Sequence, residues 1–454
     1  MDKYLSRSID QALLEWKDNP RRKPLLVRGA RQVGKSSTIR HLGKNFKYFL
    51  EVNVERNPEV MEFFKGSRDV KSIAAKLSDF FNVPVVPGET LLFLDEIQKC
   101  EDVIHSLWFF KEDYPELHVI AAGSLLEFAL KNLSSFGVGR VSSLFVYPMS
   151  FDEFLTATRQ EGLLRIKRNS SPTNPLPEAF YNRLVEAFRS YMLVGGMPEA
   201  VATYTETGSY RYSSDIVNEI IQGYQDDFAK YGAKANPLLL RQTLISVAHQ
   251  AGAKFVCSRV EGQYRSAEVK VALEMLKDAG LIIPTYHTDA NGVPLGAEIN
   301  ERVVKYLIHD TGVLLGILGI DDDIDERIKE MMVADSIDLV DKGHVAEMMA
   351  GLELIKYSSP QTRHQLYYWK NMNKGTCAEV DYVIARSGSI VPIEVKSGVK
   401  GSMSSMYSLM RNPQKHIEMG IRCSLENFGT FASPDGKKID IIPLYAISNL
   451  FVEK

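Results

Sequence analysis

The chain has 454 residues and a formal net charge of −3, and 45% of its residues are hydrophobic while 24% are charged. This length exceeds what a single hydrophobic core usually holds, so several domains are predicted. The sequence contains no run of about eighteen apolar residues, so no membrane-spanning helix is predicted. The small net charge restricts any nucleic-acid-binding surface to a local patch.

The first 23 residues are predicted to form an amphipathic helix with Ile9, Leu13, Leu14 and Trp16 on its apolar side. They contain no uninterrupted apolar stretch and no small-residue cleavage site, so a secretory signal is not expected and a cytoplasmic location is predicted. The four cysteines are widely spaced, which argues against both a disulfide framework and a zinc site.

A glycine-rich motif follows the first predicted strand. The apolar run Leu25-Leu26-Val27 predicts that buried strand, and residues 36–44 can continue as a helix. Between them, eight residues fit the phosphate-binding pattern G-x-x-x-x-G-K-[ST], namely Gly29, Ala30, Arg31, Gln32, Val33, Gly34, Lys35 and Ser36. The order of strand, glycine loop and helix is typical of a P-loop, so ATP is the predicted ligand.

Each position in this loop has a predicted role. Gly29 and Gly34 permit the tight turns that direct backbone N–H groups and the helix N-terminus at the phosphates. Lys35 is predicted to contact the β- and γ-phosphates and the Ser36 hydroxyl to bind Mg²⁺, with Ser37 as a weaker substitute. A glycine turn that merely joins a strand to a helix is the alternative.

A strand predicted at 48–54 is followed by the continuous apolar run 91–94, which ends in Asp95 and Glu96. A strand buried on both faces is apolar throughout, and its carboxyl end opens onto the phosphate crevice. The pattern is therefore typical of a Walker B motif. Asp95 is predicted to hold Mg²⁺, and Glu96 to orient or deprotonate the attacking water. An acidic pair at a strand end also occurs as a helix cap, but its position after a P-loop favours the catalytic interpretation.

The next predicted strand, 118–124, ends in Ser124. In P-loop ATPases with an additional strand, the polar residue at this place senses the γ-phosphate or the water, and Ser124 is assigned to it. Capping of the helix at 125–131 is an equally suitable role, and the two roles are compatible. Arg140 follows a small-residue loop and precedes a strand at 143–147, which makes it the leading candidate for a trigger or finger arginine.

Five segments carry a family resemblance, and they read GARQVGKSS, LLFLDEIQ, AAGSLLE, GRVSSLFVYPMSFDEFL and LVGGMPEAV. Together they resemble the bacterial and archaeal AAA-superfamily ATPases whose C-terminal half is a domain of unknown function with a nuclease-like end. The resemblance covers nearly the whole chain and is most specific in residues 24–155. It implies an ATP-binding core, a helical segment with a glycine-proline motif, a winged-helix module and a restriction-endonuclease-like terminal domain.

The glycine-proline motif is Gly195-Gly196-Met197-Pro198. It resembles the motif that related ATPases place near the adenine, which makes Pro198 a candidate nucleotide contact. A plain turn between two helices explains the same residues equally well.

Between the ATPase core and the terminal domain, residues 159–177 are predicted to be a turn-rich linker. Apolar spacing then predicts helices at 239–251 and 265–279, followed by a strand that starts at Leu281. This order resembles a winged helix. The second helix carries both acidic and basic residues on its outward side, which slightly favours packing against protein over DNA binding.

The C-terminal part contains a second group of candidate residues. Asp381 and the sequence Glu394-Val395-Lys396 lie on two alternating runs around a Ser/Gly turn, which predicts a hairpin of half-buried strands. They match the aspartate and E-x-K elements of PD-(D/E)XK nucleases, and Glu347 matches their helical glutamate. By that resemblance Asp381 and Glu394 bind Mg²⁺, while Lys396 helps to generate the hydroxide. The alternatives are a salt bridge within E-x-K and a retained fold without activity.

The predicted fold class is α/β, with a doubly wound parallel sheet of the additional-strand P-loop NTPase class, a helical and winged-helix segment, and a restriction-endonuclease-like α/β domain. The predicted domains are a P-loop core at 1–158, a helical connector at 159–232, a winged-helix-like module at 233–333 and a nuclease-like domain at 334–454.

The function expected first is Mg²⁺-dependent ATP hydrolysis that drives or gates a DNA-associated C-terminal half. A metal-dependent DNA nuclease gated by ATP is one alternative. The other is a nucleotide-dependent switch that docks DNA, a protein partner or a second copy of itself. No membrane partner is expected.

Overall fold

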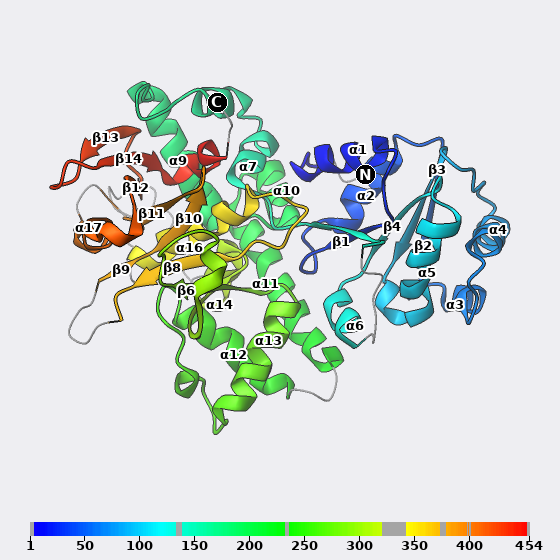
Figure 1. The fold of residues 1–454 in the computed structure, drawn as a ribbon. Helices are drawn as coiled ribbons and strands as arrows, with labels where there is room; N and C mark the ends of the chain where they lie inside the picture. Colours follow the sequence, from blue (N-terminus) through cyan, green and yellow to red (C-terminus); the bar gives the residue numbers. More distant parts are fainter. Residues whose placement is uncertain are drawn as a thin grey trace. The chain divides into compact units, whose positions relative to one another are not determined.

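The chain folds into two compact units, whose elements are labelled in Figure 1. The structure is a computed structural model, and it describes residues 4–132, 139–231, 236–319, 342–372, 378–396, 398 and 401–451. Unit 1 comprises Met1–Tyr147, Asp278–Gly280 and Ser359–Arg363, and unit 2 comprises Pro148–Lys277, Leu281–Ser358 and His364–Lys454. The finer division into four domains stays a prediction.

Unit 1 is built around a five-stranded sheet with the strand order β2-β3-β4-β1-β5, in which every pairing is parallel. Its strands are β1 (Leu25–Arg28), β2 (Tyr48–Asn53), β3 (Thr90–Asp95), β4 (His118–Ala122) and β5 (Ser142–Phe145). Because β4 lies between β1 and β3, the sheet has the additional strand that the sequence predicted. Every residue of β3 and β4 is buried, which explains why residues 91–94 and 119–122 are continuously apolar.

The helices of unit 1 are α1 (Ile9–Asp18), α2 (Lys35–Gly43), α3 (Met61–Phe64), α4 (Val70–Phe81), α5 (Glu101–Asp113) and α6 (Leu126–Asn132). Helices α3, α4 and α5 pack Phe64, Ile73 and Leu107 against Leu92 and Leu94 of β3 in one hydrophobic core. The P-loop fold predicted for this part of the chain is confirmed.

A segment from late in the sequence contacts the edge strand β5 of this sheet. The N–H of Phe145 in β5 donates a 2.8 Å hydrogen bond to the carbonyl of Pro360. Pro360 lies in Ser359–Arg363, one of the three stretches that make up unit 1. A later part of the chain therefore satisfies one backbone donor of the edge strand β5.

Unit 2 begins with helices and continues into two sheets. Its helices are α7 (Phe151–Ala157), α8 (Glu161–Arg168), α9 (Glu178–Val194), α10 (Pro198–Thr207), α11 (Tyr210–Asp227), α12 (Pro237–His249), α13 (Ser266–Asp278, whose last residue belongs to unit 1), α14 (Thr311–Ile317), α16 (Lys342–Lys356) and α17 (Ser404–Arg411). The prediction of a turn-rich linker over 159–177 is wrong for its first half, because α8 forms there and buries Leu163, Leu164 and Lys167.

One sheet of unit 2 has four strands in the order β7-β6-β8-β9, and the other has five in the order β10-β11-β12-β14-β13. The strands are β6 (Ile282–Thr288), β7 (Ile299–Ile308), β8 (Leu366–Lys370), β9 (Glu379–Val380), β10 (Tyr382–Arg386), β11 (Ser389–Val395), β12 (Met419–Ser424), β13 (Gly429–Ala432) and β14 (Lys438–Pro443). Helices α12 and α13 followed by the antiparallel pair β6 and β7 have the helix, helix and hairpin order expected of a winged helix.

The predicted hairpin is present as β10 and β11, with Tyr382 opposite Ile393. Glu379, two residues before Asp381, lies in the separate strand β9, which pairs with β8. One detail differs from the expectation of half-buried strands. Strand β11 is buried on both faces from Ile390 to Val395, because it is a central strand paired with β10 and β12 and contacted by both α16 and α17.

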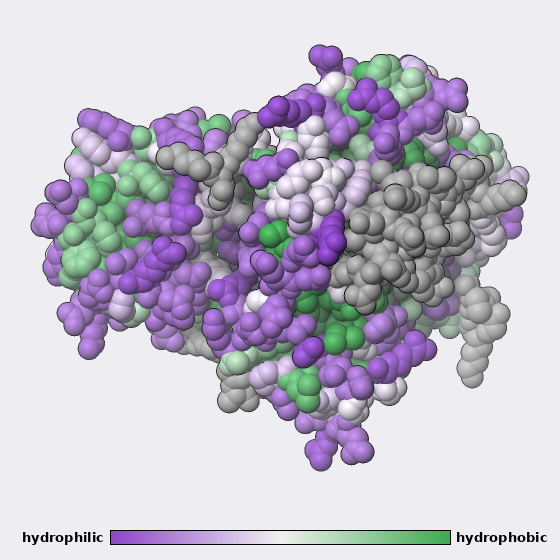
Figure 2. All heavy atoms as spheres, turned by 180° about the vertical axis from the view of Figure 1, so that it is seen from behind, coloured by the Kyte–Doolittle hydropathy of each residue, from purple (hydrophilic) through white to green (hydrophobic). Residues whose placement is uncertain are grey.

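Hydrophilic side chains cover most of the face drawn in Figure 2, and hydrophobic ones occur there in scattered groups. Large apolar side chains that are exposed include Phe80, Tyr212, Leu238 and Met372. Among the helices that the structure describes, none is both long and apolar enough to cross a membrane.

Candidate functional site

The P-loop connects β1 to α2 by a turn that requires glycine. Gly29 has φ +147°, and a Cβ placed on it would lie 2.2 Å from the carbonyl oxygen of Val146. Gly34 caps α2 with φ 93°, in the left-handed region that glycine adopts without strain. The backbone can therefore turn closely over the helix N-terminus, as a phosphate-binding loop must.

Lys35 and Ser36 begin α2 and face the end of β3. The Lys35 ammonium is buried and donates hydrogen bonds of 2.9 Å and 2.6 Å to the carbonyls of Gly29 and Ala30. Burial lowers the pKa of Lys35 to about 8, although the charges of Glu96 and Asp95 oppose this shift. The Ser36 hydroxyl lies 3.3 Å from Asp95 Oδ2, so the two predicted Mg²⁺ ligands are side by side.

Burial and the neighbouring charge of Glu96 raise the pKa of Asp95, against hydrogen bonds from the Glu96 N–H and from Ser36. Asn53, at the end of β2, places its amide 3.5 Å from the same carboxylate oxygen. Sequence reasoning did not single out Asn53. The signal available was its position as the polar last residue of the strand beside β3.

Glu96 is held by three hydrogen bonds to one carboxylate oxygen. Gln98 donates at 2.5 Å, the Ser124 hydroxyl at 3.0 Å and the Ser124 N–H at 3.3 Å. Burial would raise the pKa of Glu96, but these hydrogen bonds outweigh it and hold the pKa below the usual value. Of the two roles predicted for Ser124, capping a helix would use its hydroxyl oxygen as an acceptor. In the structure this hydroxyl donates to Glu96. Gln98 was not predicted, and its partner is evident only in three dimensions.

Arg7 joins the N-terminal segment to the P-loop. Its guanidinium donates hydrogen bonds of 2.9 Å to the carbonyl of Val33 and 2.7 Å to the carbonyl of Tyr147. Arg7 is buried, with 9% of its surface exposed. The sequence did not identify this residue, because a single arginine in an amphipathic helix usually faces solvent.

Arg140 lies at the amino-terminal ends of the strands, whereas the P-loop lies at their carboxyl ends. It forms a 2.8 Å ion pair with Glu112, and its guanidinium lies 4.1 Å from the centre of the Trp108 ring. Because α5 runs antiparallel to β3, Glu112 marks the amino-terminal edge of the strands. The structure therefore does not bring Arg140 to the P-loop of its own sheet.

Ser37, the weaker substitute for Ser36 as a Mg²⁺ ligand, lies on the exposed side of α2.

The Gly195-Gly196 pair is packed inside unit 2. The N–H of Gly196 donates a 2.6 Å hydrogen bond to Asp310, which also caps α14, and the Met149 N–H donates to the Gly196 carbonyl at 2.6 Å. Pro198 is the first residue of α10. These contacts explain the glycines as a tight joint between helices, and contact of Pro198 with adenine stays a prediction.

The C-terminal candidates converge in unit 2. Asp381 precedes Tyr382, which pairs with Ile393, so Asp381 and Glu394 face each other across the hairpin. Asp381 accepts a 2.7 Å hydrogen bond from the Val395 N–H, and Lys396 donates one of 2.6 Å to Glu394. The latter is the salt bridge within E-x-K that the sequence left open as an alternative.

Glu347 of α16 completes this group, together with a residue that the sequence did not reveal. Lys305 of β7 pairs with Glu347 at 2.8 Å and with Glu379 at 2.6 Å. Burial raises the pKa of Glu347 to about 8 and that of Glu394 to about 7, and the charge of Asp381 adds to both shifts. Within the described ranges, no group of three or more His, Cys, Asp or Glu side chains is arranged to hold a metal ion.

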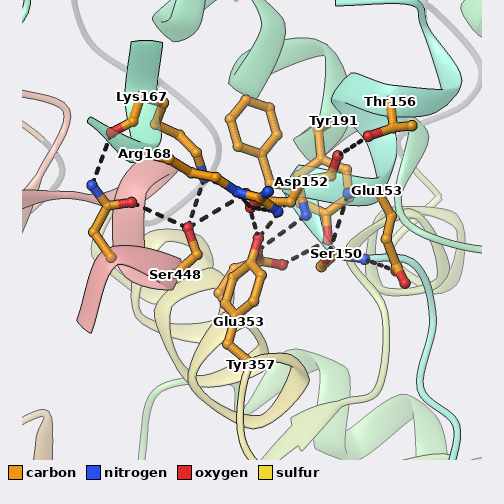
Figure 3. A network of polar contacts seen from close by, with 12 residues as sticks. Ser150, Asp152, Glu153, Thr156, Lys167, Arg168, Tyr191, Glu353, Tyr357 and Ser448 are labelled. Atoms are coloured by element: carbon orange, nitrogen blue, oxygen red, sulfur yellow. Dashed lines mark hydrogen bonds and ion pairs between the residues drawn. The ribbon is translucent and has the colours of Figure 1, made fainter. Parts of the chain in front are cut away.

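A separate polar network lies at the start of unit 2 (Figure 3). Its centre is the ion pair of Lys167 with Asp152, whose side chains are 0% and 8% exposed. Asp152 also accepts from Arg168 at 3.1 Å and from the Tyr357 hydroxyl at 2.9 Å. Although burial favours the neutral acid, Lys167 keeps the pKa of Asp152 below its usual value.

This network joins elements that are distant in the sequence. Glu353 of α16 accepts a 3.1 Å hydrogen bond from the Phe151 N–H at the start of α7. Lys167 of α8 donates at 2.7 Å to Ser448 in the helical turn Leu444–Leu450. The buried charges hold α7, α8, α16 and the C-terminal turn together, and they indicate a structural role.

Comparison with known families agrees with the P-loop geometry. A family profile described as an AAA domain matches residues 21–155, the stretch that holds the P-loop, β3 and Ser124. Residues 21–155 therefore resemble an AAA domain in sequence and have a P-loop fold. Two profiles of domains of unknown function, DUF8612 and DUF4143, match residues 185–324 and 342–447.

Outside the AAA domain the comparisons give no function. None of the curated proteins matches the sequence significantly. Among solved structures, a chain of the Aeropyrum pernix ORC1 protein, determined in complex with DNA, is similar over 72% of this chain and 95% of its own, with 12% identity and a TM-score of 0.31. A TM-score this low supports no conclusion about the present chain.

Proposed function

We propose that the protein hydrolyses Mg²⁺-bound ATP in the AAA domain and uses the nucleotide cycle to act on its C-terminal half. The observation that carries the proposal is the arrangement of Lys35, Ser36, Asp95 and Glu96 at the carboxyl edge of the parallel sheet. These four side chains fit the requirements of a metal-bound triphosphate, since they offer an ammonium, two Mg²⁺ ligands and a base.

Lys35 would exchange the carbonyls of Gly29 and Ala30 for phosphate oxygens. Because these oxygens are negatively charged, they favour the charged form of the lysine. Ser36 and Asp95 would hold Mg²⁺, which neutralises phosphate charge when bound. Glu96 would orient the attacking water and accept its proton. The hydrogen bonds from Ser124 and Gln98 fix the direction of the Glu96 carboxylate, so both residues are positioning residues for this step.

The test is ATP binding and turnover by the wild type, Lys35→Ala and Glu96→Gln. Lys35→Ala is expected to lose at least about tenfold in nucleotide affinity, because a charge-assisted phosphate contact contributes 1.5 kcal/mol or more, by rough estimate. Glu96→Gln is expected to bind ATP normally and to turn over about 100-fold more slowly. Lys44→Ala, at the exposed end of α2, is the matched control. Unchanged turnover in both active-site variants would exclude this site.

A second proposal is that the C-terminal domain is nuclease-like. It is favoured by the convergence of four candidate residues, Glu347, Asp381, Glu394 and Lys396. A metal-dependent cut of DNA would use the carboxylates for Mg²⁺ and Lys396 for the hydroxide. The buried Lys305 opposes this chemistry, and it favours the version in which the domain docks DNA or a protein without cutting.

Incubation of supercoiled and single-stranded DNA with Mg²⁺ or Mn²⁺ distinguishes the two versions. The reactions contain no nucleotide, ADP or ATP, and they compare the wild type with Lys396→Ala. Cutting by the wild type that Lys396→Ala lacks would support a nuclease. No cutting in any nucleotide state would leave a docking domain.

A further inference from the structure

The ammonium of Lys305 is buried among carboxylates that come from different elements. The residue is 1% exposed and lies in the middle of β7. Its Nζ lies 2.8 Å from Glu347 Oε1 in α16 and 2.6 Å from Glu379 Oε1 in β9, and it lies 4.9 Å from the centre of the Tyr368 ring. A lysine loses its hydration at such a site, so it is retained only where acids and an aromatic face replace the water.

One carboxylate oxygen of the same cluster has no such compensation. Glu394 is 4% exposed, and its Oε1 accepts from Lys396 at 2.6 Å. Its Oε2 is buried without a hydrogen-bond partner in the part of the chain that the structure describes. Glu394 lies opposite Asp381 in the hairpin, and the hydroxyl of the next residue, Tyr382, donates a 2.8 Å hydrogen bond to the carbonyl of Glu347, so this carboxylate belongs to the cluster.

The charges of the cluster do not balance completely. It has four carboxylates, Glu347, Glu379, Asp381 and Glu394, and three ammonium groups, Lys305, Lys370 and Lys396. Lys370 and Lys396 are partly exposed, with side-chain exposures of 38% and 21%, so Lys305 is the deeply buried cation. A group of buried acids is stable only when a cation or a proton offsets their repulsion.

We propose that Lys305 is a built-in cation that occupies this cluster in place of a divalent metal ion. The described carboxylates are not arranged to hold a metal ion while Lys305 is charged, and removal of its charge would let Glu347, Asp381 and Glu394 close around one. The ammonium and a metal ion would compete for the same oxygen of Glu347, and two cations at that distance repel strongly in a buried environment. Carboxylate oxygens alone select a hard ion such as Mg²⁺ or Mn²⁺.

This proposal concerns ion binding and is independent of ATP hydrolysis and of DNA cutting. In the wild type the cluster is predicted to be closed to metal, while the charge of Lys305 holds β7, α16 and β9 together. The unpartnered oxygen of Glu394 then gains a ligand only when the ammonium has been removed.

The test is a Mn²⁺ titration of the full-length, nucleotide-free protein, followed by the EPR signal of free Mn²⁺. Lys305→Met is expected to bind one Mn²⁺ more per chain than the wild type. Lys305→Met/Glu394→Gln is expected to lose that ion. Lys370→Met, which removes the exposed partner of Glu379, is the matched control and is expected to gain none. Binding at the P-loop contributes equally to all four proteins and cancels in the comparison.

Lys305→Met leaves buried acids unpaired, so its fold is measured by circular dichroism with and without Mn²⁺. Lys305→Met/Glu379→Gln removes one charge of each sign and keeps the three proposed ligands, so it provides a folded alternative. The additional ion in either variant, or refolding of Lys305→Met by Mn²⁺, would support the proposal. A wild type that already binds this ion, or two variants that never gain it, would overturn the proposal.

Discussion

The hydroxyl of Ser124, just beyond the end of β4, donates a 3.0 Å hydrogen bond to the carboxylate of Glu96, just beyond the end of β3. If Glu96 is the base, Ser124→Ala removes a hydrogen bond that both orients it and favours its charged form. We expect kcat to fall about tenfold with an unchanged ATP affinity, since one such bond contributes about 1.5 kcal/mol.

The same substitution also predicts a change in the pH dependence of turnover. The hydrogen bonds of Ser124 and Gln98 lower the pKa of Glu96, so their loss shifts the acidic limb of the pH–rate profile to higher pH. Stopped-assay rates between about pH 3 and 7, a range that spans the ordinary Glu pKa of about 4.3, measure both effects. An unshifted limb with a tenfold slower rate would assign Ser124 to a contact other than Glu96.

Arg7 predicts a link between the N-terminal segment and nucleotide binding. Arg7→Ala breaks charge-assisted bonds to the carbonyls of Val33 and Tyr147, of which the bond to Val33 is buried. We expect about tenfold weaker ATP binding and a lower thermal midpoint of unfolding, which calorimetry measures. Arg21→Ala, on an exposed residue, is the control. Equal affinities for Arg7→Ala and Arg21→Ala would contradict the proposed link.

Lys35 predicts a pH dependence of ATP affinity. In the nucleotide-free protein its pKa is about 8, and phosphate favours the charged form. Below pH 8 the lysine is already charged and binding takes up no proton, whereas above pH 8 binding must first protonate it. We expect Kd to rise about tenfold per pH unit above about 8, which titration calorimetry in two buffers would detect as proton uptake. A constant Kd up to pH 9.5 in the wild type, with Lys44→Ala as the control, would refute this assignment.

The effect on stability has the corresponding sign. Because the pKa of Lys35 in the folded protein lies below its ordinary value of about 10.4, the unfolded chain binds more protons between these two pH values. The contribution of Lys35 to the stability of the nucleotide-free protein is therefore unfavourable below pH 8 and is relieved as the pH rises towards 10.

The buried network of Figure 3 predicts unequal effects of two neighbouring cations. Lys167→Met leaves Asp152 as a buried, poorly compensated charge, and we expect a loss of about 3 to 5 kcal/mol in the free energy of unfolding. Arg168→Ala removes a partner of the same carboxylate whose side chain is 55% exposed, so the expected loss is at most about 1 kcal/mol. Urea denaturation measures both, and similar losses would show that Lys167 is not the dominant partner.

The sequence predicted the AAA domain well because its signals are local. A strand such as β3, covered on both faces, must be apolar along its whole length, and the close approach of Gly29 to Val146 admits no side chain. The hairpin of β10 and β11 was also predictable, since Ser387 and Gly388 adopt the positive φ that its turn requires.

The partners of buried charges could not be predicted in the same way. Lys305 pairs with residues that lie 42 and 74 positions away, and Lys167 contacts Ser448 across 281 positions. One signal was available, because Val303, Lys305 and Leu307 alternate on one buried face of β7. A lysine on such a face must have acidic partners, but the sequence does not say which acids they are.

The hydrogen bond from Phe145 to Pro360 has a consequence for how this protein can be divided or inherited. Since unit 1 includes Ser359–Arg363, a fragment that stops at residue 147 would lack part of that unit and the acceptor of the Phe145 hydrogen bond. An exchange of unit 1 between relatives would therefore have to carry every stretch that builds it, and not only the first 147 residues.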